Sequence, residues 1–76
     1  MNFHEFIEVN PKILVGKPVI KGTRLAVEFI LDLLANGVSE AEIISSYPGL
    51  TPAQIRACVA YAAELVKNER VFPMAG

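Results

Sequence analysis

Residues 39–64 read SEAEIISSYPGLTPAQIRACVAYAAE, and this stretch contains two helix starts separated by one break. Ser39 and Glu42 have the spacing of a capping box, in which each side chain accepts a hydrogen bond from the backbone N–H of the other residue. Such a cap contributes about 1 kcal/mol to stability. The dipeptide Pro48-Gly49 then breaks the helical pattern. We therefore expect a helix over residues 39–47.

The second helix start lies directly after this break. Thr51 is the expected cap, Pro52 takes the first helical position, and Gln54 completes a second capping box. We expect this helix over residues 51–68. Its apolar face repeats every three or four residues and consists of Ile55, Cys58, Val59, Ala62, Leu65 and Val66. Its other faces carry small residues that either raise helix propensity or admit another backbone closely, namely Ala53, Ala57, Ala60 and Ala63.

A further helix is expected upstream, over residues 26–36. Apolar residues share one helix face there, and they are Val27, Ile30, Leu31 and Leu34. Asn36-Gly37 supplies the stop signal. Phe29 and Leu33 form a second apolar pair off this face. The helix is therefore apolar on more sides than a three-helix monomer needs.

Two short extended segments precede the helices. Residues 6–10 alternate apolar and polar side chains, and Asn10-Pro11 ends the alternation with a turn. A second extended segment is expected over residues 17–20, because Pro18 disfavours the helical conformation in the residue before it. We expect the two segments to pair as a β-ribbon within residues 6–24.

These elements predict a single domain of the mainly α class over residues 1–76. Three helices, the last two joined by a short turn, match the helix-turn-helix arrangement. The β-ribbon precedes them, and an apolar tail over residues 69–76 follows them. A chain of 76 residues has room for one thin hydrophobic core.

The segment Pro11–Ala26 reads PKILVGKPVIKGTRLA and contains no acidic residue. Its four cations are Lys12, Lys17, Lys21 and Arg24. The formal net charge of the whole chain is only −1, so the charge is unevenly distributed rather than basic overall. Two interpretations remain open. In one, the cations solvate the ribbon edge against aggregation. In the other, a backbone phosphate or the acidic site of a partner protein is contacted by Lys17, Lys21, Thr23 and Arg24.

The last helix is a candidate for DNA readout. In helix-turn-helix proteins, the N-terminal residues of the recognition helix reach base edges in the major groove. Here those residues include Thr51, Gln54 and Arg56. Gln and Arg side chains can read base edges, but only Arg56 adds positive charge and no basic cluster flanks it. DNA binding is therefore an alternative rather than the first expectation.

The sequence offers little for catalysis. His4 is the single histidine, and Cys58, the single cysteine, lies on an apolar helix face. These two residues do not form a nucleophile–base pair by any recognisable motif, and they show no metal-ligand spacing. We expect a non-enzymatic protein without a metal or cofactor.

Two further expectations concern location and assembly. The chain contains no apolar run of about 18 residues and no signal-peptide pattern, so we expect a cytoplasmic protein without a membrane partner. Apolar residues make up 53% of the chain, more than one small core absorbs. We therefore expect a homodimer, with a candidate interface formed by Phe29, Leu33 and Val19.

The chain resembles a known prokaryotic family, domain of unknown function 433, from about Ile7 to Glu64. The resemblance is carried by the Asn-Pro turn, by GKPVIKGTRLAV at residues 16–27, by the helix that ends at Asn36-Gly37, and by the stretch quoted first.

The resemblance implies a homeodomain-like three-helix fold with an N-terminal β-ribbon. It also implies an antitoxin-like role in a toxin–antitoxin pair, whose other half is similar to a PIN-type ribonuclease. Our own first interpretation adds a second role, repression of the operon that encodes the protein. Because a PIN-type active site is acidic, it could be capped by Lys17, Lys21 or Arg24. The competing expectations are a stand-alone DNA-binding regulator and a small scaffold protein.

Overall fold

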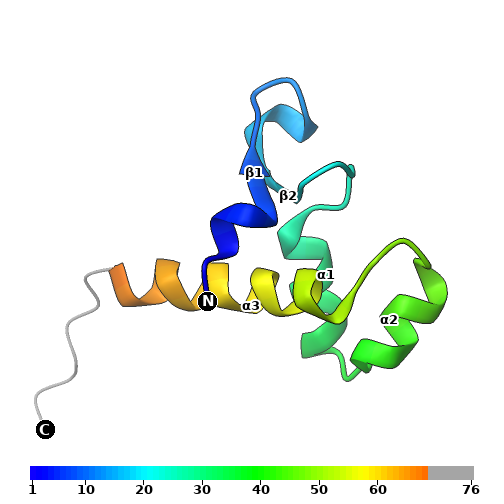
Figure 1. Cartoon of the computed structure of the whole chain (residues 1–76). Coiled ribbons are helices and arrows are strands. Elements are labelled where there is room, and N and C mark those ends of the chain that lie inside the picture. The colour runs from blue at the N-terminus through cyan, green and yellow to red at the C-terminus, as the bar shows by residue number, and fades with distance from the viewer. Residues whose placement is uncertain (69–76) are drawn as a thin grey trace, which may run out of the picture.

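The structure, a computed structural model, describes residues 1–68 and consists of a two-stranded β-ribbon above three helices (Figure 1). In chain order the elements are η1 (Phe3–Glu5), β1 (Ile7–Val9), η2 (Leu14–Gly16), β2 (Pro18–Ile20), α1 (Val27–Ala35), α2 (Glu40–Ser46) and α3 (Pro52–Asn68), where η marks a 3₁₀ turn. The mainly α architecture with an N-terminal ribbon is as expected. The tail over residues 69–76 lies outside the described residues.

The ribbon is an antiparallel pair in which Ile7 lies opposite Ile20 and Val9 opposite Pro18. Ile7 and Ile20 are buried and belong to the core beneath the ribbon. Val19 is also fully buried, and it forms an isolated bridge with Ala26. The prediction that Val19 lies in a dimer interface is therefore wrong. The chain segment that leads from β2 into α1 returns along this strand and covers it.

Helix α1 supplies the centre of the core. Ile30 is fully buried and Val27 nearly so, and the chain leaves the helix through Gly37, whose φ of +85° favours glycine. Phe29 packs edge-to-face on Tyr47, with ring centroids 5.7 Å apart. Leu33 is partly buried against the core. Phe29 and Leu33, the second apolar pair of α1, therefore pack largely against other residues of the same chain.

Both capping boxes are present. Ser39 Oγ accepts from the backbone N–H of Glu42 at 3.1 Å, and Glu42 Oε1 accepts from the backbone N–H of Ser39 at 3.2 Å. Thr51 and Gln54 form the same reciprocal pair at 3.3 and 2.8 Å. These bonds satisfy backbone donors that a helix start leaves unpaired, so both helices begin where the sequence predicts.

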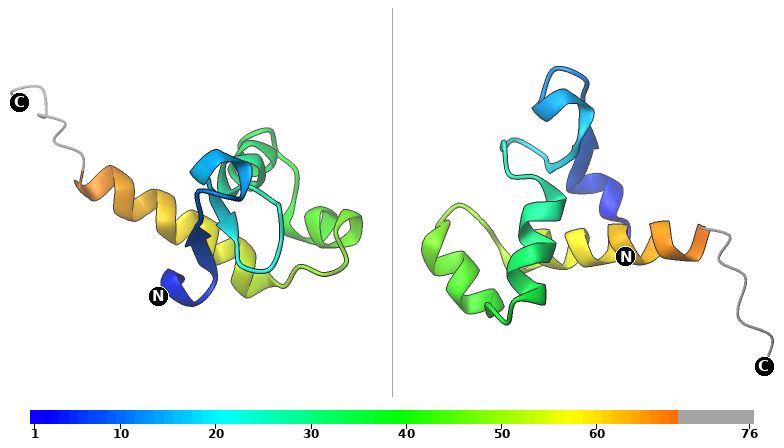
Figure 2. Two further views of the ribbon diagram at one scale, coloured as in Figure 1. Left: turned by 90° about the horizontal axis from the view of Figure 1, so that it is seen from above. Right: turned by 180° about the vertical axis from the view of Figure 1, so that it is seen from behind.

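Helix α3 departs from its expected burial pattern. Ile55 and Cys58 are buried as predicted, but Ala57, assigned to an outer face, is fully buried as well. Among the predicted core residues, Val59, Leu65 and Val66 are 48, 52 and 68% exposed. The reason is geometric, because α1 and the ribbon cover only the first part of α3 and its last turns extend beyond them (Figure 2).

The N-terminus is not a frayed end. Phe3 in η1 packs edge-to-face on Tyr61 of α3, with ring centroids 5.3 Å apart. The side chain of Asn2 caps this 3₁₀ turn by accepting from the backbone N–H of His4 at 3.2 Å. Within residues 1–68, no helix combines the length and the apolar character needed to cross a membrane.

Candidate functional site

The end of the β-ribbon that points away from α3 combines exposure with backbone strain (Figure 1). Leu14, Val15 and Gly16 have φ values of 48°, 56° and 80°, so three successive residues adopt the left-handed region. Only Gly16 does so without a steric penalty. Val15 is β-branched and 95% exposed. The strain at each of the two non-glycine residues costs about 1–3 kcal/mol, and such strain often marks a functional segment.

The cations of the ribbon differ in their surroundings. The ammonium of Lys17 pairs with the carboxylate of Glu28 at the start of α1, and Lys21 Nζ donates to the carbonyl oxygen of His4 at 3.1 Å. Arg24 is exposed, and its guanidinium has no hydrogen bond or ion pair within residues 1–68. The same holds for the side chain of Lys12 in this part of the chain. Arg24 and Lys12 are therefore the cations most available to an acidic ligand.

Thr23 organises the turn after β2. Its hydroxyl donates to the carbonyl oxygen of Ile20 at 2.8 Å and accepts from the backbone N–H of Leu25 at 3.0 Å. Gly22 completes the turn with a φ of 80°. Because the single hydroxyl proton of Thr23 is donated to Ile20, donation to an acidic ligand would break that internal hydrogen bond. Its observed contacts hold Arg24 at the surface.

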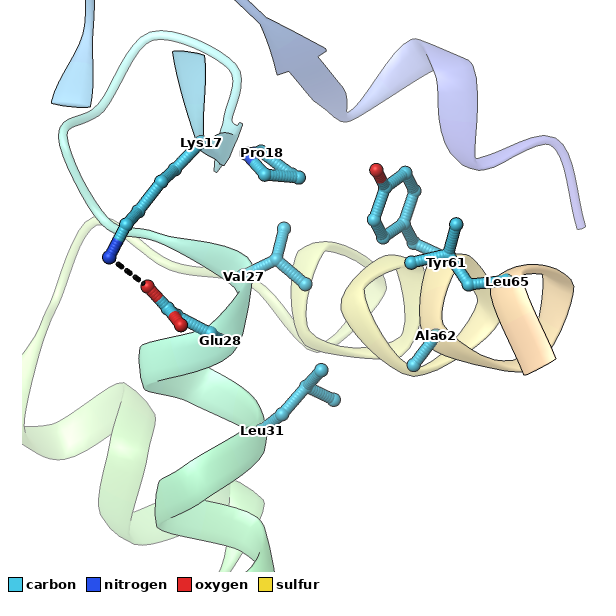
Figure 3. Close-up of a pocket in the computed structure, with 8 residues that line it drawn as sticks. All are labelled: Lys17, Pro18, Val27, Glu28, Leu31, Tyr61, Ala62 and Leu65. Carbon is cyan, nitrogen blue, oxygen red and sulfur yellow. Dashed lines mark hydrogen bonds and ion pairs between the residues drawn. The ribbon is translucent and has the colours of Figure 1, made fainter. Parts of the chain in front are cut away.

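Two apolar hollows lie on either side of the Lys17–Glu28 pair. One hollow is a groove of about 210 Å³ between the ribbon, α1 and the second half of α3, and Figure 3 shows its lining residues: Lys17, Pro18, Val27, Glu28, Leu31, Tyr61, Ala62 and Leu65. The other hollow, of about 260 Å³, is lined by Leu14, Val15, Lys17, Ala26 and Glu28. Apolar walls beside one ion pair suit the docking of an apolar side chain from another protein.

Sequence reasoning missed this groove. Leu31, Tyr61 and Leu65 have the helical spacing of core residues, and a core face and a groove wall share that signal. What separates them is the distance between α1 and α3, which the sequence pattern does not specify. Figure 3 shows Leu31 and Ala62 facing each other across the groove.

The residues predicted to read DNA are not equally available. Thr51 and Gln54 bond to each other in the capping box of α3. Arg56, two residues after Gln54, is exposed. Of the three candidates, Arg56 alone presents an uncommitted side chain within the described part of the chain, residues 1–68.

Cys58 has the environment of a structural thiol. It is fully buried, and desolvation by burial raises its pKa from 9.0 to about 11, although a backbone hydrogen bond acts in the opposite direction. At neutral pH the group is therefore a protonated thiol with low nucleophilicity. His4, by contrast, lies exposed in η1. Among residues 1–68, no three His, Cys, Asp or Glu side chains are grouped so that they could hold a metal ion.

Comparison with known proteins gives a consistent family assignment. The sequence profile described as "Protein of unknown function (DUF433)" matches residues 7–62. The chain is also similar to the crystal structure of a DUF433 member protein from Anabaena variabilis, with a TM-score of 0.75 and 26% sequence identity. That similarity covers 80% of this chain and 60% of the Anabaena chain, so this chain spans little more than half of that relative. No curated protein matches the chain.

Proposed function

The chain belongs to the DUF433 family, and on that premise we propose that it is a non-enzymatic, antitoxin-like protein that binds and neutralises a PIN-type ribonuclease. The observation that carries the proposal is the exposed Arg24 on a ribbon whose segment 11–26 contains no acid. An unpaired guanidinium is suited to a carboxylate cluster because it can donate two parallel hydrogen bonds to one carboxylate.

The shape of the ribbon supports insertion into a cleft. Val15 stands at the end of the ribbon with 95% of its surface exposed, and Lys12 lies close to it in sequence. An apolar tip among cations can enter an acidic cleft, in which the cations meet carboxylates and the tip displaces water. Lys21 donates to a neutral backbone carbonyl and keeps its net charge, so it contributes to the local positive field, whereas Glu28 offsets the charge of Lys17.

The first step of the test is to obtain the partner. A tagged copy of the chain is purified from its native cells after nuclease treatment, and the bound proteins are identified by mass. Recovery of a PIN-type protein in a fixed ratio supplies the reagent for the functional assay. Recovery of the tagged chain alone contradicts the antitoxin role.

The second step measures inhibition directly. The purified partner cleaves an RNA substrate, and its rate is followed as the wild-type chain or a variant is added. We expect Arg24→Glu to weaken inhibition at least tenfold, because a carboxylate would then face carboxylates. The matched control is Lys67→Glu, which makes the same change of charge on α3. Equal inhibition by the wild-type chain and Arg24→Glu would overturn the proposal that the ribbon contacts the acidic site of the ribonuclease.

A second candidate function is operator binding in a homeodomain-like, helix-turn-helix manner. It is supported by the α2–α3 arrangement and by the exposed Arg56 at the start of α3. If it holds, affinity for operator DNA falls steeply as salt rises, and Arg56→Glu abolishes it. An affinity for DNA that changes neither with salt nor in Arg56→Glu would contradict operator binding. Both candidate functions agree with the cytoplasmic location that the sequence predicts, whereas a scaffold protein would show neither activity.

A further inference from the structure

The groove between the ribbon, α1 and α3 continues the core toward the end of α3. Tyr61 and Leu65 lie on the side of the helix that buries Cys58, since each residue turns the helix by about 100°. Cys58 is fully buried, whereas Leu65 is 52% exposed within residues 1–68. Figure 3 shows Leu31 of α1 on the opposite wall of the groove. Among the described residues, the core side of α3 is therefore only partly covered at the groove.

The segment that follows α3 in the sequence has the composition of a groove occupant. Residues 69–76 read ERVFPMAG, so two charged residues precede the apolar side chains of Val71, Phe72 and Met74. Pro73 disfavours the helical conformation at Phe72, which favours an extended segment in place of further turns of α3. An extended segment that leaves the helix can turn back along it.

Phe72 can reach the groove from the end of α3. Leu65 lies about 4.5 Å along the helix axis from Asn68 and about 60° around it, so the chain leaves the helix close to the groove. Phe72 is four residues beyond Asn68, and four extended residues span up to about 13 Å. If Glu69 and Arg70 make the turn, the next two residues span about 6–7 Å and bring Phe72 back to the level of Leu65.

The size and charge of the groove fit the ring of Phe72. An apolar cavity of about 150 Å³ holds a benzene molecule, and the groove has about 210 Å³. Its two charged lining residues, Lys17 and Glu28, pair with each other. The groove therefore offers apolar walls beside charges that already offset each other, and the segment 71–74 is uncharged as well. A charged ligand would gain little from these walls.

Tethering favours this segment over other occupants of the groove. A segment that is joined to its site by a short flexible linker is present there at an effective concentration in the millimolar range. Only Glu69 and Arg70 separate the end of α3 from Val71. An apolar side chain of another protein that binds the groove with equal affinity would need a similar concentration to compete with the segment.

We propose that segment 71–74 folds back and docks in this groove of the same chain, with the ring of Phe72 against Leu31, Ala62 and Leu65. The docked segment completes the core beside the second half of α3. This inference does not rest on the proposed function. It adds one condition to that function, because a partner that uses the groove has to displace the segment.

The test uses tryptophan fluorescence, since the chain contains no tryptophan. Phe72→Trp places the probe at the proposed anchor, and Gly76→Trp places it in the same tail outside the docked segment. Acrylamide quenching is measured for both variants of the whole chain. We expect Phe72→Trp to be quenched at least about threefold less than Gly76→Trp, because a concave site shields most of the surface of its ligand. The protection should not change between about 1 and 100 μM protein, because the site and the segment belong to one chain.

A second substitution tests the groove itself. Leu65→Glu, added to Phe72→Trp, places a charge in the groove and should raise the quenching to that of Gly76→Trp. The matched control is Val66→Glu, which makes the same kind of change at an exposed apolar residue that does not line the groove. The control should leave the quenching low. Equal effects of the two substitutions would mean that the segment lies elsewhere and would overturn the proposal.

The wild-type chain gives an independent measurement, which is needed because tryptophan is larger than phenylalanine. Nuclear Overhauser spectra should show contacts between the ring of Phe72 and the methyl groups of Ala62 and Leu65. Such contacts would support the proposal even if the larger ring of Phe72→Trp were not protected. Equal quenching of the two tryptophan variants without these contacts would overturn it. Protection that rises with protein concentration would also overturn it, because the segment would then dock on a second copy.

Discussion

In the helical body the residues suit their local structure, whereas at the end of the β-ribbon they do not. In the body, helix caps, apolar spacing and burial agree with one another, and no buried side-chain polar atom within residues 1–68 lacks a hydrogen bond. At the end of the ribbon, Leu14 and Val15 adopt a backbone region that disfavours them, and Val15 exposes an apolar side chain. Local conflict of this kind is expected where function, rather than stability, selects the residue.

The largest effect should come from the body. Ile30 is fully buried in α1, so Ile30→Ala should lower the free energy of unfolding by about 2–5 kcal/mol, because it removes buried methyl groups and leaves a cavity. Val15→Ala is the matched change in the ribbon and should alter stability by less than about 0.5 kcal/mol. Urea denaturation monitored by circular dichroism measures both. Similar losses for the two variants would remove the distinction between the regions.

Next in size is a pH effect from Cys58. Its pKa is 9.0 when unperturbed and about 11 in the folded chain. Between these values the unfolded chain loses the thiol proton while the folded chain retains it, so the free energy of unfolding should be unaffected by Cys58 below about pH 9 and fall between pH 9 and 11. The decline attributable to Cys58 should reach about 2 kcal/mol. Because Tyr and Lys also titrate in this range, the measurement is the difference in slope between the wild type and Cys58→Ala; equal slopes would contradict the prediction.

The helix caps should give smaller effects. Thr51→Ala and Ser39→Ala each remove a hydroxyl that accepts from a backbone N–H, at a cost of about 1 kcal/mol. Ser45→Ala is the control, since Ser45 is exposed within α2 and caps nothing in the described chain. Thermal denaturation should show lower melting temperatures for both cap variants and an unchanged or slightly higher one for the control. A lower melting temperature for all three variants would mean that loss of the hydroxyl destabilises the protein by a mechanism other than helix capping.

Relief of strain in the ribbon should have an effect of opposite sign. Asn tolerates the left-handed region better than Val does, so Val15→Asn should raise the free energy of unfolding by about 0.5–1 kcal/mol. Val9→Asn, at an exposed position of β1 with ordinary backbone, should instead be destabilising because Asn is a poor strand residue. If the ribbon binds a partner through its tip, Val15→Asn should also weaken that binding. A destabilised Val15→Asn would show that the tip is not strained.

The smallest effect should come from the Lys17–Glu28 pair. Both side chains are more than half exposed, so their coupling in a double-mutant cycle with Lys17→Ala and Glu28→Ala should not exceed about 0.5 kcal/mol. The coupling should decrease further in high salt. A coupling above about 2 kcal/mol would mean that the end of the ribbon is held more rigidly than the exposure of Lys17 and Glu28 indicates.

The sequence predicted features that depend on neighbouring residues well. It predicted poorly which residues are covered by segments distant in the sequence. The caps at Ser39 and Thr51 and the stop at Gly37 depend on side chains within a few residues of one another, and all three are present. The burial of Val19 depends on a segment that returns from a later part of the chain. Helical spacing alone cannot supply that information.

The candidate site was predicted in part. The cations of segment 11–26 are evident from composition, but composition does not show which of them are available to bind a ligand. Lys17 and Lys21 have partners in α1 and in the N-terminal turn, whereas Arg24 has none within residues 1–68. The groove beside α3 had no separate signal, since its walls are made of residues that resemble core residues. The role of Thr23 in the turn also required the structure.

The sequence by itself determined where the helices and strands begin and end, because capping, proline and glycine act through bonds between near neighbours. Only the tertiary structure decided which apolar residues of α3 became core and which became surface. Helix α1 crosses α3 and does not run along it, and α2 has only 7 residues, so both contact only part of the 17 residues of α3 (Figure 1). The same period of apolar residues therefore buries Ile55 and Cys58 and exposes Val59 and Val66, and the packing geometry of the helices, not the sequence pattern, is the physical reason.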